Sequence, residues 1–188
     1  MAAGAVCRDG EWQNDDALAL WRAGLPGLSY AEVNPYCLEE PVSPHLAAAA
    51  TGVELSAARL VEHLPALRRV AEFVVVEGAG GWRVPLGPDL DIAGLAGRLD
   101  LPVLLVVGLR LGCLNHAQLS EAVIRADGAR LVGWVATQVD PDMRRVGENL
   151  DTLHARLHAP CLGVLPHPAA PASAGLARPL DLAAVWRR

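Results

Sequence analysis

The chain of 188 residues contains no lysine, because all 16 of its basic residues are arginines. A mechanism that needs an ammonium group, such as a phosphate-binding Walker A lysine, cannot be supplied by these residues. Positive charge is also not in excess, since the formal net charge is −5. Nucleic-acid surfaces need a basic stripe, so we expect no nucleic-acid partner.

Long apolar runs are missing as well. None reaches the roughly 18 residues that a membrane-spanning helix needs, and the first twelve residues lack the basic and apolar regions of a signal peptide. The histidines form no metal-like cluster, and no CxxC pair occurs among the scattered cysteines, which are Cys7, Cys37, Cys113 and Cys161. We therefore expect reduced thiols in a cytoplasmic protein without a membrane partner.

Hydrophobic residues make up 52% of the chain, which predicts one folded domain over residues 1–188. Short β-branched runs are the clearest feature. They predict strands at 71–77, 102–109, 129–137 and 160–166. The runs are nearly continuous in apolar residues, as strands buried on both faces are.

Helical patterns alternate with these strands. We predict helices over 14–24 with a cap at Asn14 or Asp15, over 54–70 at least as far as Pro65, over 114–128 and over 143–158. Residues 25–52 are rich in loops, and the tail ends in a short helix. The alternation predicts an α/β fold in which helices cover both faces of a mostly parallel sheet.

Ligands of such sheets bind at the carboxyl ends of the strands. That position is predicted for Glu77, for the loop 108–115, for Thr137 with Gln138, and for Pro166 with His167. Four strand ends at one edge make a binding site more credible than any single motif does.

Three features of this edge have a chemical and a structural interpretation. Glu77 followed by the small residues 78–81 suits Mg²⁺ and phosphate, but it also fits an ordinary glycine-rich turn with a solvated acid. The amides of residues 112–115 at a helix N-terminus suit a carboxylate or phosphate, or only begin a helix. Asp16 is a metal ligand or only part of a helix cap.

Four segments taken together resemble the dethiobiotin synthetase family. They are VNPYCLEEPVSPH (33–45), VEGAGGWRVPL (76–86), PVLLVVGLRLGCLNHAQLS (102–120) and LVGWVAT (131–137), in the family's order and spacing. The resemblance extends from about Met1 to His167. It implies a P-loop NTPase-like fold, a homodimer, and closure of a ureido ring from 7,8-diaminononanoate and CO2 with ATP and Mg²⁺.

The resemblance also implies roles for individual residues. Asp16 and Glu77 would be Mg²⁺ ligands at the ATP site, where Gly78, Ala79 and Gly80 lie near the nucleotide. The border of the adenine would consist of Thr137, Gln138, Pro166, His167 and Pro168. The carboxylate of the diamine would be held by Gly112, Cys113, Leu114 and Asn115, and Ala3 falls where the family has a serine that contacts the substrate.

The chain departs from the family at several places. Thr137 and Gln138 replace the usual Asn-Asp pair, and Arg110 stands where lysine is frequent. The opening MAAG matches the end of a family motif, KPVASG, so the first strand, the P-loop and its lysine, and the lysine after the second strand have no counterpart. No catalytic residue is identified. We expect a truncated reading of the gene, with poor folding and no ATP-dependent activity.

Two other classes stay open on the sequence alone. One is a related P-loop ATPase or amidoligase with another substrate. The other is a non-catalytic binding protein that kept the fold without its phosphate clamp.

Overall fold

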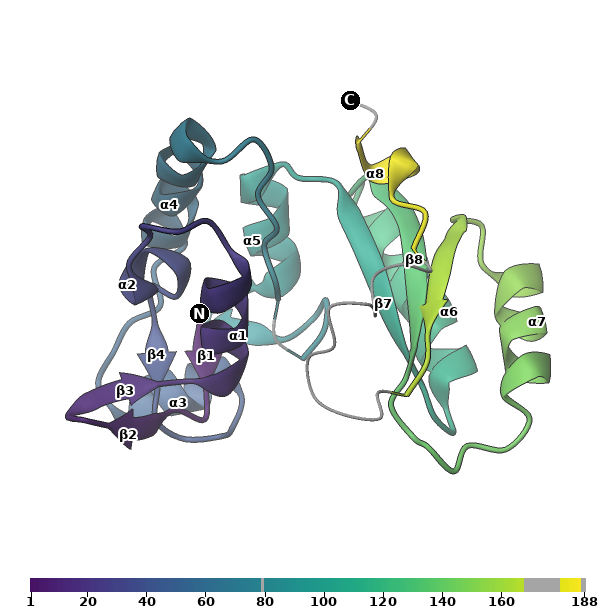
Figure 1. Ribbon diagram of the computed structural model, residues 1–188, viewed down its shortest axis with the longest axis horizontal. Helices are drawn as coiled ribbons and strands as arrows, with labels where there is room; N and C mark the ends of the chain where they lie inside the picture. Colours follow the sequence, from purple (N-terminus) through teal and green to yellow (C-terminus); the bar gives the residue numbers. More distant parts are fainter. Residues whose placement is uncertain (79, 168–179, 187–188) are drawn as a thin grey trace. The chain divides into compact units, whose positions relative to one another are not determined.

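The computed structural model describes residues 1–78, 80–167 and 180–186, and its chain divides into two compact units, Met1–Leu99 and Asp100–Arg188 (Figure 1). Each unit combines helices with strands, as the predicted α/β class requires. The prediction of a single domain stays a prediction. None of the helices within the described ranges has the length and apolar composition that crossing a membrane requires.

The second unit is built on a parallel sheet of three strands, seen side by side in Figure 1. Its order is β7 (Val103–Leu109), β8 (Leu131–Gln138) and β9 (Cys161–Leu165), which confirms three of the predicted strands. Leu109 lies opposite Gln138, and Thr137 lies opposite Leu165. The carboxyl ends of the three strands therefore meet at one edge, as predicted.

Two helices pack on one face of this sheet, α6 (Cys113–Ala126) and α7 (Val146–Arg156), and both were predicted from the sequence. The core between sheet and helices includes Leu109, Ala136 and Leu153, each 0% exposed. Trp134 is buried beside them and donates its indole N–H to the carbonyl of Ala159 at 3.0 Å. A short helix, α8 (Ala183–Trp186), contacts β8.

The first unit contains much shorter strands. β1 (Ala2–Ala3) pairs in parallel with β4 (Cys37–Leu38), and α3 (Pro44–Ala50) packs against both. The core of this unit is a cluster of buried residues from several elements: Tyr36, Leu38, Ala47, Ala48, Leu55, Leu86 and Leu95.

Two antiparallel pairs complete the strands of the first unit. β2 (Val6–Arg8) and β3 (Glu11–Gln13) form a hairpin whose turn residues, Asp9 and Gly10, both have positive φ, at 53° and 86°. An Asp-Gly pair is favoured in this type of turn. β5 (Pro85–Gly87) pairs with β6 (Leu90–Asp91), which leads into α5 (Ile92–Leu99).

The helices of the first unit follow local signals in the sequence. α1 (Asp15–Ala23) begins after Asn14, whose side chain caps it as predicted. α2 (Tyr30–Val33) has a capping box made by Ser29 and Glu32. α4 (Ala57–Val70) confirms the predicted helix and continues through Pro65, although this residue has no N–H to donate.

The predicted strand at 71–77 is wrong. This segment has no regular secondary structure, and it joins none of the sheets within the described residues. Val75 and Val76 are 74% and 47% exposed, so the run of valines is not buried on either face. An apolar run predicts burial, but a strand forms only where a neighbouring strand supplies the hydrogen-bonded ladder.

Candidate functional site

Asp16 lies in the first turn of α1, where a negative charge interacts favourably with the helix dipole. Its neighbour Asp15 forms an ion pair with Arg8, with 2.7 Å between Oδ1 and Nη2. Asp16 is exposed and has no ion pair or side-chain hydrogen bond within the described residues. Of the two acids, Asp16 is therefore the one with an available carboxylate.

Asn14 links this helix to β1. Its side-chain Oδ1 accepts a hydrogen bond from the N–H of Ala17 at 3.1 Å, and its Nδ2 donates to the carbonyl of Ala3 at 2.9 Å. The side chain of Asn14 thus joins the predicted site residue Ala3 to the first turn of α1, which contains Asp16. Ala3 itself is half-buried at the end of its short strand.

Glu77 follows the irregular segment 71–76 and is exposed, so it does not stand at the mouth of a buried strand as predicted. It lies within electrostatic reach of the amino group of Met1, next to β1. Burial lowers the pKa of that amino group, while the electrostatic influence of Cys37 and of the Glu77 carboxylate acts in the opposite direction.

The small residues after Glu77 have a conformational reason to be small. Gly80 has a φ of 80°, and a Cβ atom placed on it would lie 2.9 Å from Cγ2 of Val84. A side chain at Gly80 would therefore be strained and would also collide with its neighbour. Gly78 is exposed, and Ala79 lies outside the described residues.

Two candidate residues of the first unit carry the type of ligand atom that Mg²⁺ binds. Asp16 and Glu77 offer exposed carboxylate oxygens, the ligand type that Mg²⁺ prefers. The described residues contain no group of three or more His, Cys, Asp or Glu that could enclose a metal ion. Mg²⁺ in phosphate-transfer sites needs no such cage, because one or two carboxylates bind it together with water and substrate phosphates.

The N-terminus of α6 is the clearest anion-binding feature of the second unit. Gly112 precedes the helix with a φ of 94°, and no side chain caps it. The amides of Leu114 and Asn115 have no hydrogen-bond partner within the described residues. Such amides, together with the helix dipole, favour a negatively charged group.

Cys113 differs from the prediction for this loop. Its amide is not available, because it donates to the carbonyl of Arg110 at 3.0 Å and so closes the turn that leads into α6. Its side chain is only 2% exposed and packs in the core. Cys113 therefore fixes the shape of the loop, while the open amides are those of its neighbours.

The ends of β8 and β9 are joined by a hydrogen bond. Nδ1 of His167 lies 3.1 Å from the carbonyl oxygen of Gln138, and Thr137 is half-buried next to Gln138. Pro166 is exposed beside His167. Four of the five residues predicted to border the adenine therefore lie together, and the fifth, Pro168, lies outside the described residues.

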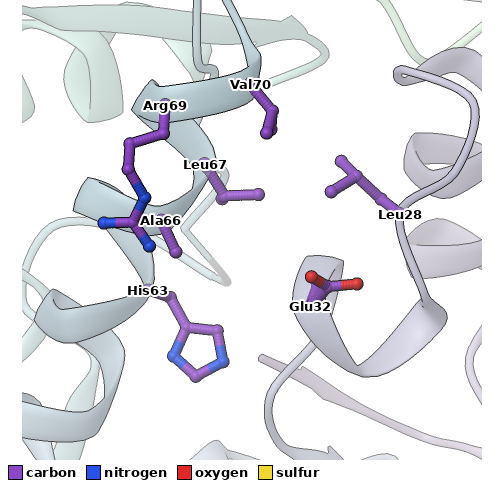
Figure 2. A pocket seen from close by; sticks show the side chains of 7 residues that line it. All are labelled: Leu28, Glu32, His63, Ala66, Leu67, Arg69 and Val70. Atoms are coloured by element: carbon purple, nitrogen blue, oxygen red, sulfur yellow. The ribbon is translucent and has the colours of Figure 1, made fainter.

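A separate groove of about 190 Å³ lies between α2 and α4 (Figure 2). Glu32 and His63 face each other across it, and Leu28, Leu67 and Val70 contribute apolar surface. None of the predicted site residues lines this groove. The carboxylate of Glu32 is already used, because it accepts hydrogen bonds from the N–H and the hydroxyl of Ser29, which lower its pKa.

Comparison with known proteins places the chain among ATP-using enzymes. Residues 8–171 match the protein family described as an AAA domain. The chain is 50% identical over 184 residues to the ATP-dependent dethiobiotin synthetase BioD of Aromatoleum aromaticum, which covers 97% of this chain and 81% of that protein.

Two further relatives carry the same name. The protein of Xanthomonas campestris pv. campestris is 48% identical over 182 residues, covering 97% of this chain and 81% of its own length. The protein of Xanthomonas oryzae pv. oryzae is 51% identical over 166 residues, covering 88% and 74%. These similarities extend through both units.

Proposed function

The chain belongs to the dethiobiotin synthetase family of ATP-dependent enzymes, and on this premise we propose that its reaction is the ATP-dependent formation of dethiobiotin from 7,8-diaminononanoate and CO2. One observation carries the proposal: about half of the residues are identical to a synthetase of that name over 97% of this chain. The motifs at 76–86 and 102–120 support it, because they contain the candidate residues 77–80 and 112–115.

The proposed chemistry has three steps. An amine of the substrate attacks CO2 and loses a proton, which gives a carbamate. A carbamate oxygen then attacks the terminal phosphorus of ATP and releases ADP, which leaves a carbamic–phosphoric anhydride. Finally the second amine attacks the carbonyl carbon, expels phosphate, loses a proton and closes the ureido ring. Little covalent work falls to the protein, so its task is to position and neutralise charge.

In the first unit, we propose that Asp16 and Glu77 hold Mg²⁺, with Gly78, Ala79 and Gly80 next to the nucleotide. Bound Mg²⁺ would neutralise charge on the phosphates. The free carboxylate of Asp16 and the exposure of Glu77 support this role. Ala3 would adjoin the substrate, and its carbonyl is held in place by Asn14.

In the second unit, we propose that the N-terminus of α6 receives the carboxylate of the diamine. The open amides of Leu114 and Asn115 support this role, and Gly112 gives the backbone room to approach the ligand. Arg110 would add positive charge, since it is exposed at the end of β7. Thr137, Gln138, Pro166, His167 and Pro168 would border the adenine.

The phosphate clamp is the part of the chemistry that these 188 residues do not supply. They contain no lysine and no Walker A motif, so the developing charge on the phosphates has no lysine side chain as a partner. We therefore expect the isolated chain to bind the diamine, to bind ATP weakly, and to form no dethiobiotin at a measurable rate. In this respect the isolated chain resembles the non-catalytic alternative.

Two measurements on the purified chain test this proposal. Calorimetric titration with 7,8-diaminononanoate and with Mg²⁺-ATP separates the two binding events. Incubation with both ligands and ¹³C-bicarbonate, followed by mass spectrometry, detects labelled dethiobiotin. A chain variant with Leu114→Pro, which removes one of the open amides, serves as the control for specific binding of the diamine.

Binding of the diamine that weakens in the Leu114→Pro variant supports the proposed function. Labelled dethiobiotin would support it further and would show that the expectation about the phosphate clamp is wrong. If the chain neither binds the diamine nor forms product, the proposed substrate is wrong, and the related amidoligases with other substrates become the better class.

We also propose a cytoplasmic homodimer, by resemblance to the family. The four cysteines are free thiols, which is compatible with a reducing compartment. Sedimentation equilibrium of the purified chain tests the dimer directly, since a mass of one 19.8 kDa chain at micromolar concentration contradicts it.

A further inference from the structure

Tyr30 lies at the centre of a polar network behind the N-terminus of α1. Its hydroxyl oxygen accepts a hydrogen bond from the backbone N–H of Asn14 at 2.9 Å and another from Nδ2 of Asn34 at 3.1 Å. Both asparagines are buried, at 7% and 5% exposed. Buried donors of this kind need a partner, and here the same oxygen serves both.

The two incoming donors determine the direction of the remaining bonds. A hydroxyl has two lone pairs and one hydrogen, so an oxygen that accepts twice must donate its own hydrogen elsewhere. The remaining neighbour is Sγ of Cys37, at 3.4 Å, and that thiol in turn lies 3.3 Å from the carbonyl of Trp12. The chain of donors therefore runs from Tyr30 to Cys37 to Trp12.

The ionisation of Tyr30 agrees with this direction. Burial raises the pKa of the phenol, and the hydrogen bond to Cys37 raises it further, while the bonds from Asn14 and Asn34 act in the opposite direction. The pKa remains above its ordinary value, so the phenol is protonated at neutral pH and keeps the hydrogen that it donates.

Besides the N–H that bonds to Tyr30, the other polar atoms of Asn14 are also hydrogen-bonded. Its carbonyl accepts from the N–H of Leu18, its Oδ1 caps the helix at Ala17, and its Nδ2 holds Ala3. The ring of Tyr30 also packs edge-on against Trp21 of α1, with 6.3 Å between ring centroids. Tyr30 thus contacts α1 at two places, at the cap and at Trp21 near the other end of the helix.

We propose that Tyr30 is a positioning residue, whose hydroxyl holds the Asn14 cap and thereby places the carboxylate of Asp16 for the metal ion. The metal role of Asp16 in this inference rests on the proposed function. Its hydroxyl bonds the backbone N–H of Asn14, so in this role Tyr30 acts through the backbone at residues 14–16.

The test compares two tyrosine-to-phenylalanine variants of the full chain. Tyr30→Phe keeps the ring and removes the hydroxyl. Tyr36→Phe is the matched control, because the hydroxyl of Tyr36 also accepts one backbone N–H, from Ser56 at 3.0 Å, in the same unit but away from α1. Mn²⁺ is the probe, since it replaces Mg²⁺ at oxygen ligands and broadens nearby amide signals in NMR spectra.

In the unmodified chain, we expect Mn²⁺ to broaden the amide signals of Asp16 and Gly78. In Tyr30→Phe, the Mn²⁺ concentration that halves these signals rises about tenfold, a size typical when the support of a metal ligand is removed. In Tyr36→Phe it is unchanged. Equal effects in the two variants, or no effect in Tyr30→Phe, would overturn the proposal.

Amide hydrogen exchange separates this inference from the metal site itself. Loss of the hydroxyl exposes the N–H of Asn14 and loosens that of Ala17, so both exchange faster in Tyr30→Phe and not in Tyr36→Phe. If Mn²⁺ affects neither Asp16 nor Gly78 in the unmodified chain, the proposed metal site is wrong. Unchanged exchange at Asn14 and Ala17 shows that Tyr30 does not hold the cap.

Discussion

Two segments with almost the same pattern of apolar residues differ in structure, since one forms a strand and the other does not. Residues 103–109 form β7, where Val107 is 5% exposed, whereas residues 71–77 form no strand, and Val75 there is 74% exposed. β7 pairs along its whole length with β8, from Val103 to Leu109. The segment 71–77 belongs to none of the sheets of the described chain.

The two units that contain these segments also differ in the length of their strand ladders. The second unit is organised by a continuous parallel ladder with two helices on it, and its strands have five to eight residues. The parallel pair in the first unit has only two residues in each strand. Side-chain links such as the one from Asn14 to Ala3 supplement this short ladder. An apolar run by itself thus ensures neither burial nor a strand, since Val75 is exposed and Val106 within β7 is 61% exposed. The presence of a neighbouring strand decides whether a strand forms.

The largest effect is expected at Glu121, a carboxylate in α6 that is 3% exposed. It accepts hydrogen bonds from the N–H groups of His158 and Ala159, between 2.8 and 3.1 Å, and from the guanidinium of Arg125 at 3.1 Å. Glu121→Ala leaves the N–H groups of His158 and Ala159 without this partner, and it should lower the free energy of unfolding of the second unit by about 2 to 4 kcal/mol. Residue-resolved hydrogen exchange in β8 measures this loss.

The control is Glu148→Ala, which removes a carboxylate that forms an exposed ion pair with Arg145 in the same unit. It should leave exchange in β8 unchanged. If the two substitutions increased exchange in β8 equally, the burial of Glu121 would not explain its contribution to stability.

Glu121 also makes the stability of the second unit depend on pH. Burial raises the pKa of this carboxyl group, but the hydrogen bonds from His158 and Ala159 and the charge of Arg125 outweigh burial and lower it overall. A lowered pKa means that the stabilisation is complete above the unfolded value of about 4.3 and is lost as pH falls through the folded value. In Glu121→Ala, this part of the acid sensitivity should disappear, which unfolding midpoints between neutral and acid pH would show.

A smaller effect comes from a matched pair of valines in the two apolar segments. Val107→Ala removes two methyl groups from the core and should cost about 2 kcal/mol. Val75→Ala removes the same atoms from an exposed position and should change stability by less than about 0.5 kcal/mol. Urea unfolding of both variants followed by circular dichroism measures the difference, and similar costs would contradict the contrast between the segments.

The sequence predicts elements most accurately where a local signal is present, such as a cap or an apolar run, and where a strand also has a long neighbouring strand. The three strands of the second unit and their helices were predicted close to their observed bounds, as was the cap at Asn14. The hairpin of β2 and β3 was not predicted, although the pair Asp9 and Gly10 is a strong turn signal. The strand at 71–77 was predicted wrongly, because a sequence pattern contains no information about which neighbour is present.

The candidate site likewise contains features that the sequence predicted and features that it did not. The sequence pattern correctly placed open amides at the start of α6, but it did not distinguish Cys113, whose amide is used by the turn at Arg110. Asp16 had two interpretations from the sequence, a metal ligand or part of a helix cap, and the ion pair between Arg8 and Asp15 shows which of the two neighbouring acids is already engaged. Tyr30 carries no motif, because its role depends on contacts with Asn14 and Asn34 that periodicity does not reveal.

We propose that the N-terminus of α6 receives the carboxylate of the diamine substrate, and NMR titration of the amide signals tests this role most directly. We predict that 7,8-diaminononanoate shifts the signals of Leu114 and Asn115 more than that of Cys113, whose amide is already bonded. The carboxylate-free analogue 2,3-diaminononane, in which a methyl group replaces the carboxylate, should shift none of the three. Equal shifts with both compounds, or shifts confined to other parts of the chain, would contradict the claim.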